Sequence, residues 1–165
     1  MKTSSWSYRV TQVVDALTAT MPEQDRAEAL SHLPGSLGAV FLQMSVRDQR
    51  HSLKVMRRLR AAGIEDPLML QAALLHDVGK SRVPLGIPGR SLLVLGEAFR
   101  PLAWILRVPI LGARIGRYRR HPEVGAQMVA AAGGDPRLVE IVAEHQADSP
   151  ARPETRRLQA ADGRE

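Results

Sequence analysis

The chain has 165 residues, the usual size of a single domain, and contains no cysteine, which excludes disulfides, thiolate metal sites and cysteine nucleophiles. Aromatic residues make up only 4% of the sequence, and the apolar content comes mainly from alanine, leucine, valine and isoleucine, which favours helices over a β-sandwich or barrel. Residues 1–10 contain no apolar run typical of a signal peptide, so we expect a cytoplasmic protein.

Prolines and capping residues mark the first two expected helices. Pro22 can occupy the first position of a helix that ends at Pro34. Ser45 followed by Asp48 resembles a capping box, with aspartate in place of the usual glutamate. An amphipathic pattern continues from there to Gly63, which is a suitable residue for a left-handed C-cap. Both segments are therefore predicted to be helical.

Two of the later expected helices begin with the same pair of residues. An aspartate that can cap a helix stands directly before a proline at two places, Asp66-Pro67 and Asp135-Pro136. The first of these pairs predicts a helix over residues 68–78 that Gly79 closes, and the second opens another helix. Pro153 begins a last helix that reaches Asp162. No stretch alternates between apolar and polar residues, so we predict an all-α fold without strands.

Positive charge is concentrated in one segment of the chain. The net charge is +6, but Arg82 to Arg120 contains eight arginines and one acid, Glu97, so this segment carries +7 and the remainder about −1. Such a patch suits an anionic partner or is a solvated arginine-rich surface. Within it, residues 91–107 form an amphipathic stripe, which we interpret as a lid or core helix in preference to a membrane-surface helix. Nucleic-acid binding is not expected, because no aromatic platform or known motif accompanies the arginines.

Four of the five histidines fall at motif positions. His51 lies on the second predicted helix, His76 is followed by Asp-Val-Gly-Lys, His121 begins His-Pro-Glu-Val-Gly, and His145 closes a helix. The last helix ends in Ala-Ala-Asp162. Imidazoles combined with carboxylates form a mixed site that suits Mn²⁺, Fe²⁺, Co²⁺, Ni²⁺, Zn²⁺ or Mg²⁺.

This order of motifs resembles the HD-domain superfamily of metal-dependent phosphohydrolases. The similarity spans Asp48 to Asp162 and implies a helical bundle around the metal site. We therefore expect a single HD-like domain over residues 1–165. Its parts would be an N-terminal helical extension over 1–44 and an HD core over 45–162, with an apolar and basic insert at about 82–120.

The resemblance also implies a role for individual residues. The family's primary metal ligands fall on His51, His76, Asp77 and Asp162. In members with more than one metal, histidines resembling His121 and His145 bind a second ion or the substrate phosphate. The cofactor is therefore expected to be a divalent metal.

The expected chemistry is hydrolysis of a phosphomonoester or phosphodiester. A divalent ion lowers the pKa of bound water from 15.7 toward ~7, and Asp77 can orient that water as a general base. Lys80 is expected to meet the phosphate as a point charge. Nearby arginines could add further phosphate contacts, and the candidates are Arg47, Arg50, Arg119 or Arg120. The substrate would be a phosphorylated small molecule, with nucleotides among the candidates.

Three alternatives stay open at this point. Asp148 is a second candidate for the last metal ligand, and Asp48 either supports His51 or only caps its helix. The chain could also be a regulatory or docking module. Such a module would retain the metal site and bind a membrane surface or a protein partner through residues 91–120.

Overall fold

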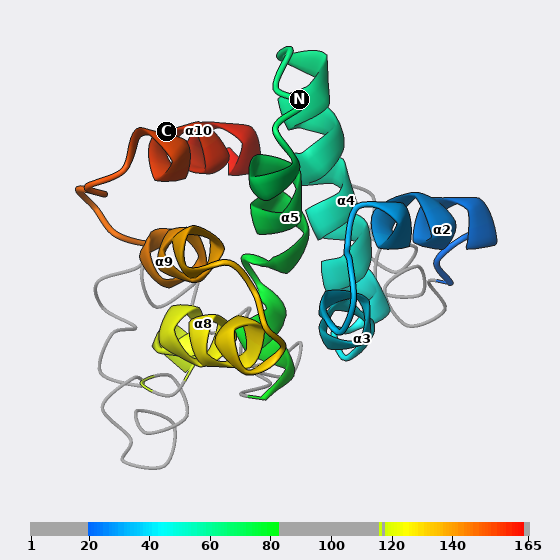
Figure 1. The fold of residues 1–165 in the computed structure, drawn as a ribbon, viewed down its shortest axis with the longest axis horizontal. Helices are drawn as coiled ribbons and strands as arrows, with labels where there is room; N and C mark the ends of the chain where they lie inside the picture. Colours follow the sequence, from blue (N-terminus) through cyan, green and yellow to red (C-terminus); the bar gives the residue numbers. More distant parts are fainter. Residues whose placement is uncertain (1–19, 83–115, 117, 164–165) are drawn as a thin grey trace, which may run out of the picture.

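The computed structural model describes residues 20–82, 116 and 118–163. Its helices are α2 (Glu23–Ser31), α3 (Leu37–Leu42), α4 (Val46–Ala61), α5 (Pro67–Leu75), the 3₁₀ helix η1 (Val78–Ser81), α8 (His121–Ala131), α9 (Pro136–Glu144) and α10 (Pro153–Asp162). None of the described residues lies in a strand, so the all-α prediction is confirmed (Figure 1). Most of the predicted insert, including the stripe at 91–107, lies outside the described residues.

The predicted helix caps are present at the positions that the sequence indicated. The Ser45 hydroxyl accepts the amide N–H of Asp48 at 3.2 Å and donates to the Asp48 carboxylate at 2.6 Å. The carboxylates of Asp66 and Asp135 each accept the amide N–H two residues later, at 3.3 and 2.7 Å. These side chains satisfy N–H groups that the helix itself leaves without a partner.

One helix prediction needs correction, and one helix was not predicted individually. Within the helical extension predicted over 1–44, no helix was marked between Pro34 and Ser45, but residues 37–42 form α3, which buries Leu37, Val40 and Phe41. The helix predicted over 68–78 ends at Leu75, and the chain continues through a turn into η1. Gly79 does not terminate a helix there, because it lies inside η1.

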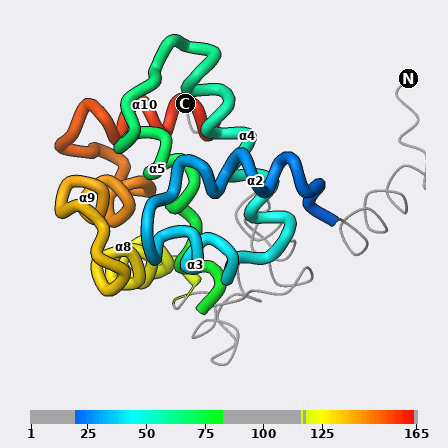
Figure 2. The backbone as a smooth tube through the Cα atoms, turned by 45° about the vertical axis from the view of Figure 1, so that its right-hand side comes forward, coloured from blue at the N-terminus to red at the C-terminus, as the bar shows by residue number. Residues whose placement is uncertain are grey.

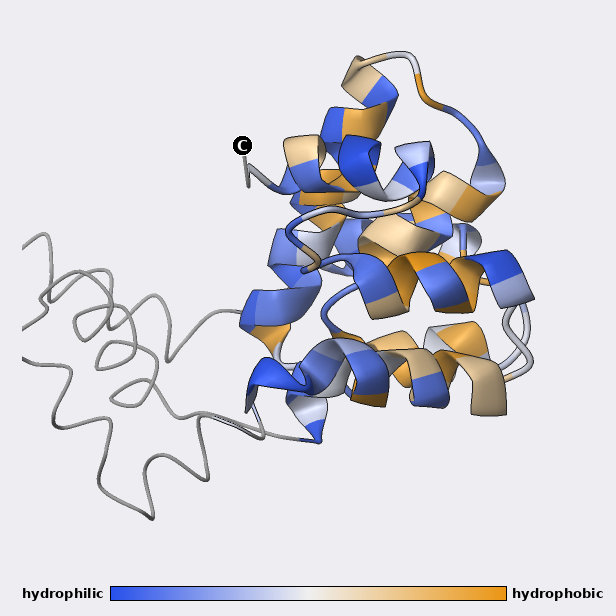
Figure 3. Cartoon of the chain, turned by 90° about the vertical axis from the view of Figure 1, so that its left-hand side faces the viewer, coloured by the Kyte–Doolittle hydropathy of each residue, from blue (hydrophilic) through white to orange (hydrophobic). Residues whose placement is uncertain are grey.

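Helix α5 is the centre of the bundle. Six of its nine residues are buried, because it packs between α4 on one side and α9 on the other and also contacts α10 (Figure 1). Apolar residues gather where the helices meet, whereas hydrophilic residues occupy the outer faces (Figure 3). A helix that is apolar on nearly all sides is stable only in such an interior position. Because α5 ends at Leu75, the residues that follow it lie in the middle of the molecule.

The backbones of η1 and α8 approach each other unusually closely. A Cβ atom added to Gly79 would lie 2.0 Å from the carbonyl oxygen of His121 and 2.6 Å from the amide nitrogen of Gly125. A Cβ atom on Gly125 would lie 3.2 Å from the amide nitrogen of Gly79. The glycines of the two sequence motifs therefore face each other. Their missing side chains allow α8 to bring His121 up to the turn that carries Asp77.

Helices α2 and α3 lie within the segment predicted as an N-terminal extension. Helix α2 runs beside α4 (Figures 1 and 2). The Arg57 guanidinium of α4 contacts Asp25 at 2.6 Å and Glu28 at 2.5 Å, and both carboxylates belong to α2. No helix among the described residues is long and apolar enough to cross a membrane.

Candidate metal centre

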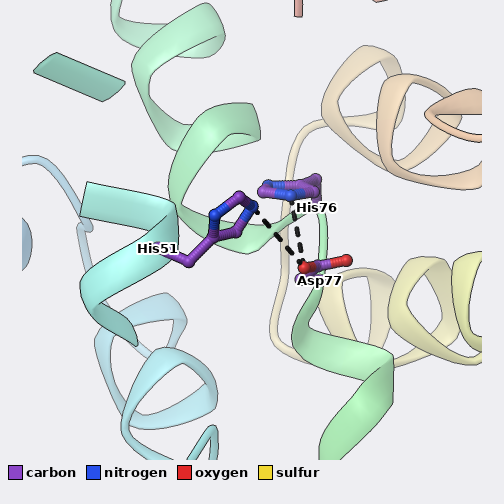
Figure 4. Close-up of side chains that lie close together, drawn as sticks. All are labelled: His51, His76 and Asp77. Atoms are coloured by element: carbon purple, nitrogen blue, oxygen red, sulfur yellow. Dashed lines mark ion pairs between the residues drawn. The ribbon is translucent and has the colours of Figure 1, made fainter. Parts of the chain in front are cut away.

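The four predicted primary ligands meet at the centre of the bundle, although they come from separate elements. His51 lies on α4, His76 and Asp77 follow α5, and Asp162 is the last residue of α10. The Nε2 atom of His51 lies 2.8 Å from Asp162 Oδ1 and 4.0 Å from Asp77 Oδ2. The Nε2 atom of His76 lies 3.4 Å from the same Asp77 oxygen (Figure 4). The same atom lies 3.9 Å from Asp162 Oδ1.

Contacts between helices hold the end of α10, which carries Asp162. The Arg58 guanidinium of α4 donates to the carbonyl oxygen of Ala161 at 2.9 Å. The amide of Gln159 donates to the carbonyl oxygens of His145 and Ala147, at 3.2 and 2.8 Å. These bonds fix the final turn of α10, so they position the candidate ligand Asp162.

The other two predicted histidines form a second group on the opposite side of Asp77. His121 Nε2 and His145 Nε2 lie 3.2 Å apart, at 3.3 and 3.6 Å from Asp77 Oδ1. Asp77 thus presents Oδ2 to the pair of His51 and His76 and Oδ1 to the pair of His121 and His145. Each histidine pair together with Asp77 has its candidate ligand atoms within 4.8 Å of one another.

Three of these imidazoles are oriented by the same backbone contact. The Nδ1 atoms of His76, His121 and His145 lie 2.9, 2.8 and 2.7 Å from the carbonyl oxygen of the residue three positions earlier. A carbonyl oxygen can only accept, so each Nδ1 carries the hydrogen, and each neutral ring turns the lone pair of Nε2 inward. His76 Nε2 is buried and has no hydrogen-bond partner among the described residues. Inward lone pairs beside a carboxylate form a donor set that fits a divalent metal.

Burial and neighbouring charges shift the pKa values in a way that suits metal ligands. Burial alone would raise the pKa of Asp77, but the electrostatic interaction with His76 and the contacts with His121 and His145 hold that pKa well below its usual range. Burial lowers the pKa of His145 to about 4, so its imidazole is neutral at pH 7. Burial would also lower the pKa of His76, but the charges of Asp77 and Asp162 outweigh it and raise that pKa.

Lys80 and Gln146 complete the surroundings of the cluster. The Lys80 ammonium lies 2.5 Å from Asp77 Oδ2, because η1 places it one turn beyond that carboxylate. The side-chain amide of Gln146 contacts His121 Nε2 at 3.1 Å. Gln146 was not predicted to belong to the site, and its position directly after His145 is the one sequence feature that could have indicated it.

The remaining candidates lie at the edge of the centre or away from it. Arg47, Arg50 and Arg120 are exposed, and Arg50 lines a pocket together with His51. Asp148 is exposed, and no contact among the described residues joins it to the cluster. Asp48 is buried and makes the capping contacts with Ser45. The structure therefore places Asp162, and not Asp148, beside His51 and His76.

Comparison with known proteins supports the same family. The HD-domain family model matches residues 49–165, which is more than half of the chain. Searches of curated proteins and of solved structures found no match. The matched region begins inside α4 and includes the five residues of the two histidine groups and also Asp162. By this match the chain belongs to the HD-domain family, a family of metal-dependent phosphohydrolases.

Proposed function

We propose that this protein is a metal-dependent phosphohydrolase that cleaves a phosphomonoester or phosphodiester, with nucleotides among the candidate substrates. The observation that carries the proposal is the position of Asp77 between two histidine pairs. A single carboxylate that presents one oxygen to each pair can serve an ion on one side and a second ion or a substrate phosphate on the other.

The chain's own residues would divide this work. His51, His76, Asp77 and Asp162 would hold the primary ion, and His121 and His145 would hold a second ion or the phosphate. A divalent ion in this position would lower the pKa of water and withdraw charge from the phosphoryl oxygens. Because the three buried histidines are anchored through Nδ1, their Nε2 atoms are held ready for these contacts.

Asp77 and Lys80 would act on the reacting groups themselves. The low pKa of Asp77 makes its carboxylate a weak base, so we assign it to ligand binding and to orienting water through an accepted hydrogen bond. Lys80 supplies a positive charge 2.5 Å from that carboxylate. We propose that the Lys80 ammonium stabilises the phosphate as charge develops on its oxygens.

A direct assay tests this function. The protein loaded with Mn²⁺ should hydrolyse a chromogenic phosphomonoester or phosphodiester, or at least one member of a nucleotide panel, and Asp77→Ala should abolish the activity. Asp148→Ala is the matched control, because this exposed aspartate lies outside the cluster, and it should retain full activity. Activity that survives in Asp77→Ala, or the absence of hydrolysis across the whole panel, would contradict the proposal.

A further inference from the structure

A pocket of about 430 Å³ opens beside the metal centre, on the side of His51. Its described lining comes from Asp25 of α2 and from Arg50, His51, Leu53, Lys54 and Arg57 of α4. Pockets of roughly 300–1,000 Å³ hold small organic ligands, so this one is large enough for a part of a substrate. His51 belongs both to the pocket and to the candidate metal centre, so a molecule could occupy the two sites at once.

The helical repeat explains why the pocket is basic. Residues on an α-helix advance by about 100° per position, which places Arg50, Lys54 and Arg57 in one stripe along α4. Leu53 flanks this stripe on one side and His51 flanks it on the other. The cationic side chains therefore lie next to the metal ligand on the same helix surface.

The three cations are not equivalent. Arg57 is held by Glu28 and Asp25, and these bonds raise the pKa of its guanidinium above the ordinary value. Arg50 and Lys54 are exposed, and neither has an ion pair or hydrogen bond within the part of the chain that the structure describes. The pocket lining thus carries three positive charges and one carboxylate, that of Asp25. Arg57 is paired with this carboxylate, whereas Arg50 and Lys54 make no ion pair within the described residues.

We propose that this pocket binds a second anionic group of the substrate, a phosphate separate from the one that meets the metal centre. The inference rests on the proposed phosphohydrolase function and narrows its substrate to a small organic molecule with two phosphate groups. Arg50 and Lys54 would contact the second phosphate, because they carry charge without a competing carboxylate. Arg57 would form one wall of the pocket, and its ion pairs with α2 would hold its side chain in place. Part of the recognition would then come from α2, which precedes the region matched by the family model.

Binding of phosphonates tests this assignment without turnover, because their carbon–phosphorus bonds resist hydrolysis. The two probes are pentylphosphonate and the bisphosphonate that carries a phosphonate at each end of a pentane chain. Calorimetry on the Mn²⁺-loaded protein gives the ratio of their dissociation constants. We expect the wild-type protein to prefer the bisphosphonate about tenfold, since charge-assisted contacts at an exposed site are of moderate strength.

Three variants decide whether the preference comes from the pocket. The double variant Arg50→Gln with Lys54→Gln should reduce the ratio to about twofold while metal content stays the same. The exchange Arg50→Lys with Lys54→Arg keeps both charges and should retain most of the preference. Arg157→Gln removes one exposed charge on α10, away from the pocket, and should leave the ratio unchanged. High salt should weaken the preference in the wild-type protein.

An equal ratio in the wild-type protein and the double variant, or no preference in the wild-type protein, would overturn the pocket assignment. The same preparations are tested for hydrolysis of the chromogenic esters. Hydrolysis without a bisphosphonate preference would refute only the second phosphate site. A lack of hydrolysis across the substrate panel would refute the proposed function, whatever the binding ratio.

Discussion

Replacing Gly79 by alanine should disturb both the fold and the metal centre. The added methyl carbon would lie 2.0 Å from the carbonyl oxygen of His121 and 2.6 Å from the amide nitrogen of Gly125. Both contacts are to backbone atoms, so no side-chain rotation can relieve them. The chain must instead separate η1 from α8, and this movement would draw His121 Nε2 away from Asp77 Oδ1, now at 3.3 Å.

The cost can be judged from the size of the overlap. A carbon and an oxygen in contact require well over 3 Å, so the backbones must separate by roughly 1 Å or more. Overpacking a filled interior costs about 1–3 kcal/mol and sometimes more. We expect about 3 kcal/mol for Gly79→Ala, because two backbone atoms are involved. For a domain of this size that loss should lower the Tm by about 6–12 °C.

Denaturant unfolding of Gly79→Ala and a matched glycine variant measures this cost. Gly63→Ala is the control, since Gly63 has a φ of 79° and no atom within 4 Å of an added Cβ. Its replacement should cost only the strain of a left-handed backbone, about 1–2 kcal/mol. Metal affinity should fall in Gly79→Ala and stay normal in Gly63→Ala. If Gly79→Ala were no less stable than Gly63→Ala and bound metal equally well, the result would contradict the close contact between the backbones of η1 and α8.

Three further predictions follow from the site. Lys80→Ala should retain its metal but lose roughly 2–4 kcal/mol of transition-state stabilisation, seen as a lower kcat/KM; an unchanged kcat/KM would remove Lys80 from the reaction. Verified removal of metal should lower the Tm, because the ligands tie α4, α10 and the turn after α5 together; an unchanged melting curve would contradict this. In the metal-free protein, the pKa of His145 near 4 means that folding favours the neutral imidazole. Its contribution should therefore be complete above pH ~6.5 and decline as the pH falls toward 4, by up to about 3 kcal/mol. Unfolding of His145→Asn at several pH values should show a shallower decline, and an identical profile would exclude this role.

The features that sequence predicted well depend on nearby residues. Ser45 caps α4 through Asp48, three positions away, and Asp66 and Asp135 cap their helices through the second following amide. Such contacts are specified by a few adjacent residues. The order of histidine and aspartate motifs also identified the family, and the structure brings the predicted ligands together, although their roles stay predictions.

The features that sequence missed depend on contacts between distant segments. Gly79 was interpreted as the end of a helix, but its function in the fold is to let α8 approach, and that contact joins residues far apart in the chain. Helix α3 is short and held by burial of its apolar side chains, so local pattern alone did not reveal it. The basic pocket was also not predicted, because the ion pairs that fix Arg57 join it to Glu28 and Asp25, which lie 29 and 32 positions earlier in the chain.

Metal content of the purified protein tests the central claim most directly. Elemental analysis should find at least one divalent ion per wild-type chain after equilibration with Mn²⁺ and removal of excess metal. Asp77→Ala should lose the ion, because Asp77 faces both histidine pairs, whereas the exposed Asp148→Ala should keep it. Full occupancy in Asp77→Ala, or no retained metal in the wild-type protein, would contradict the metal centre described above.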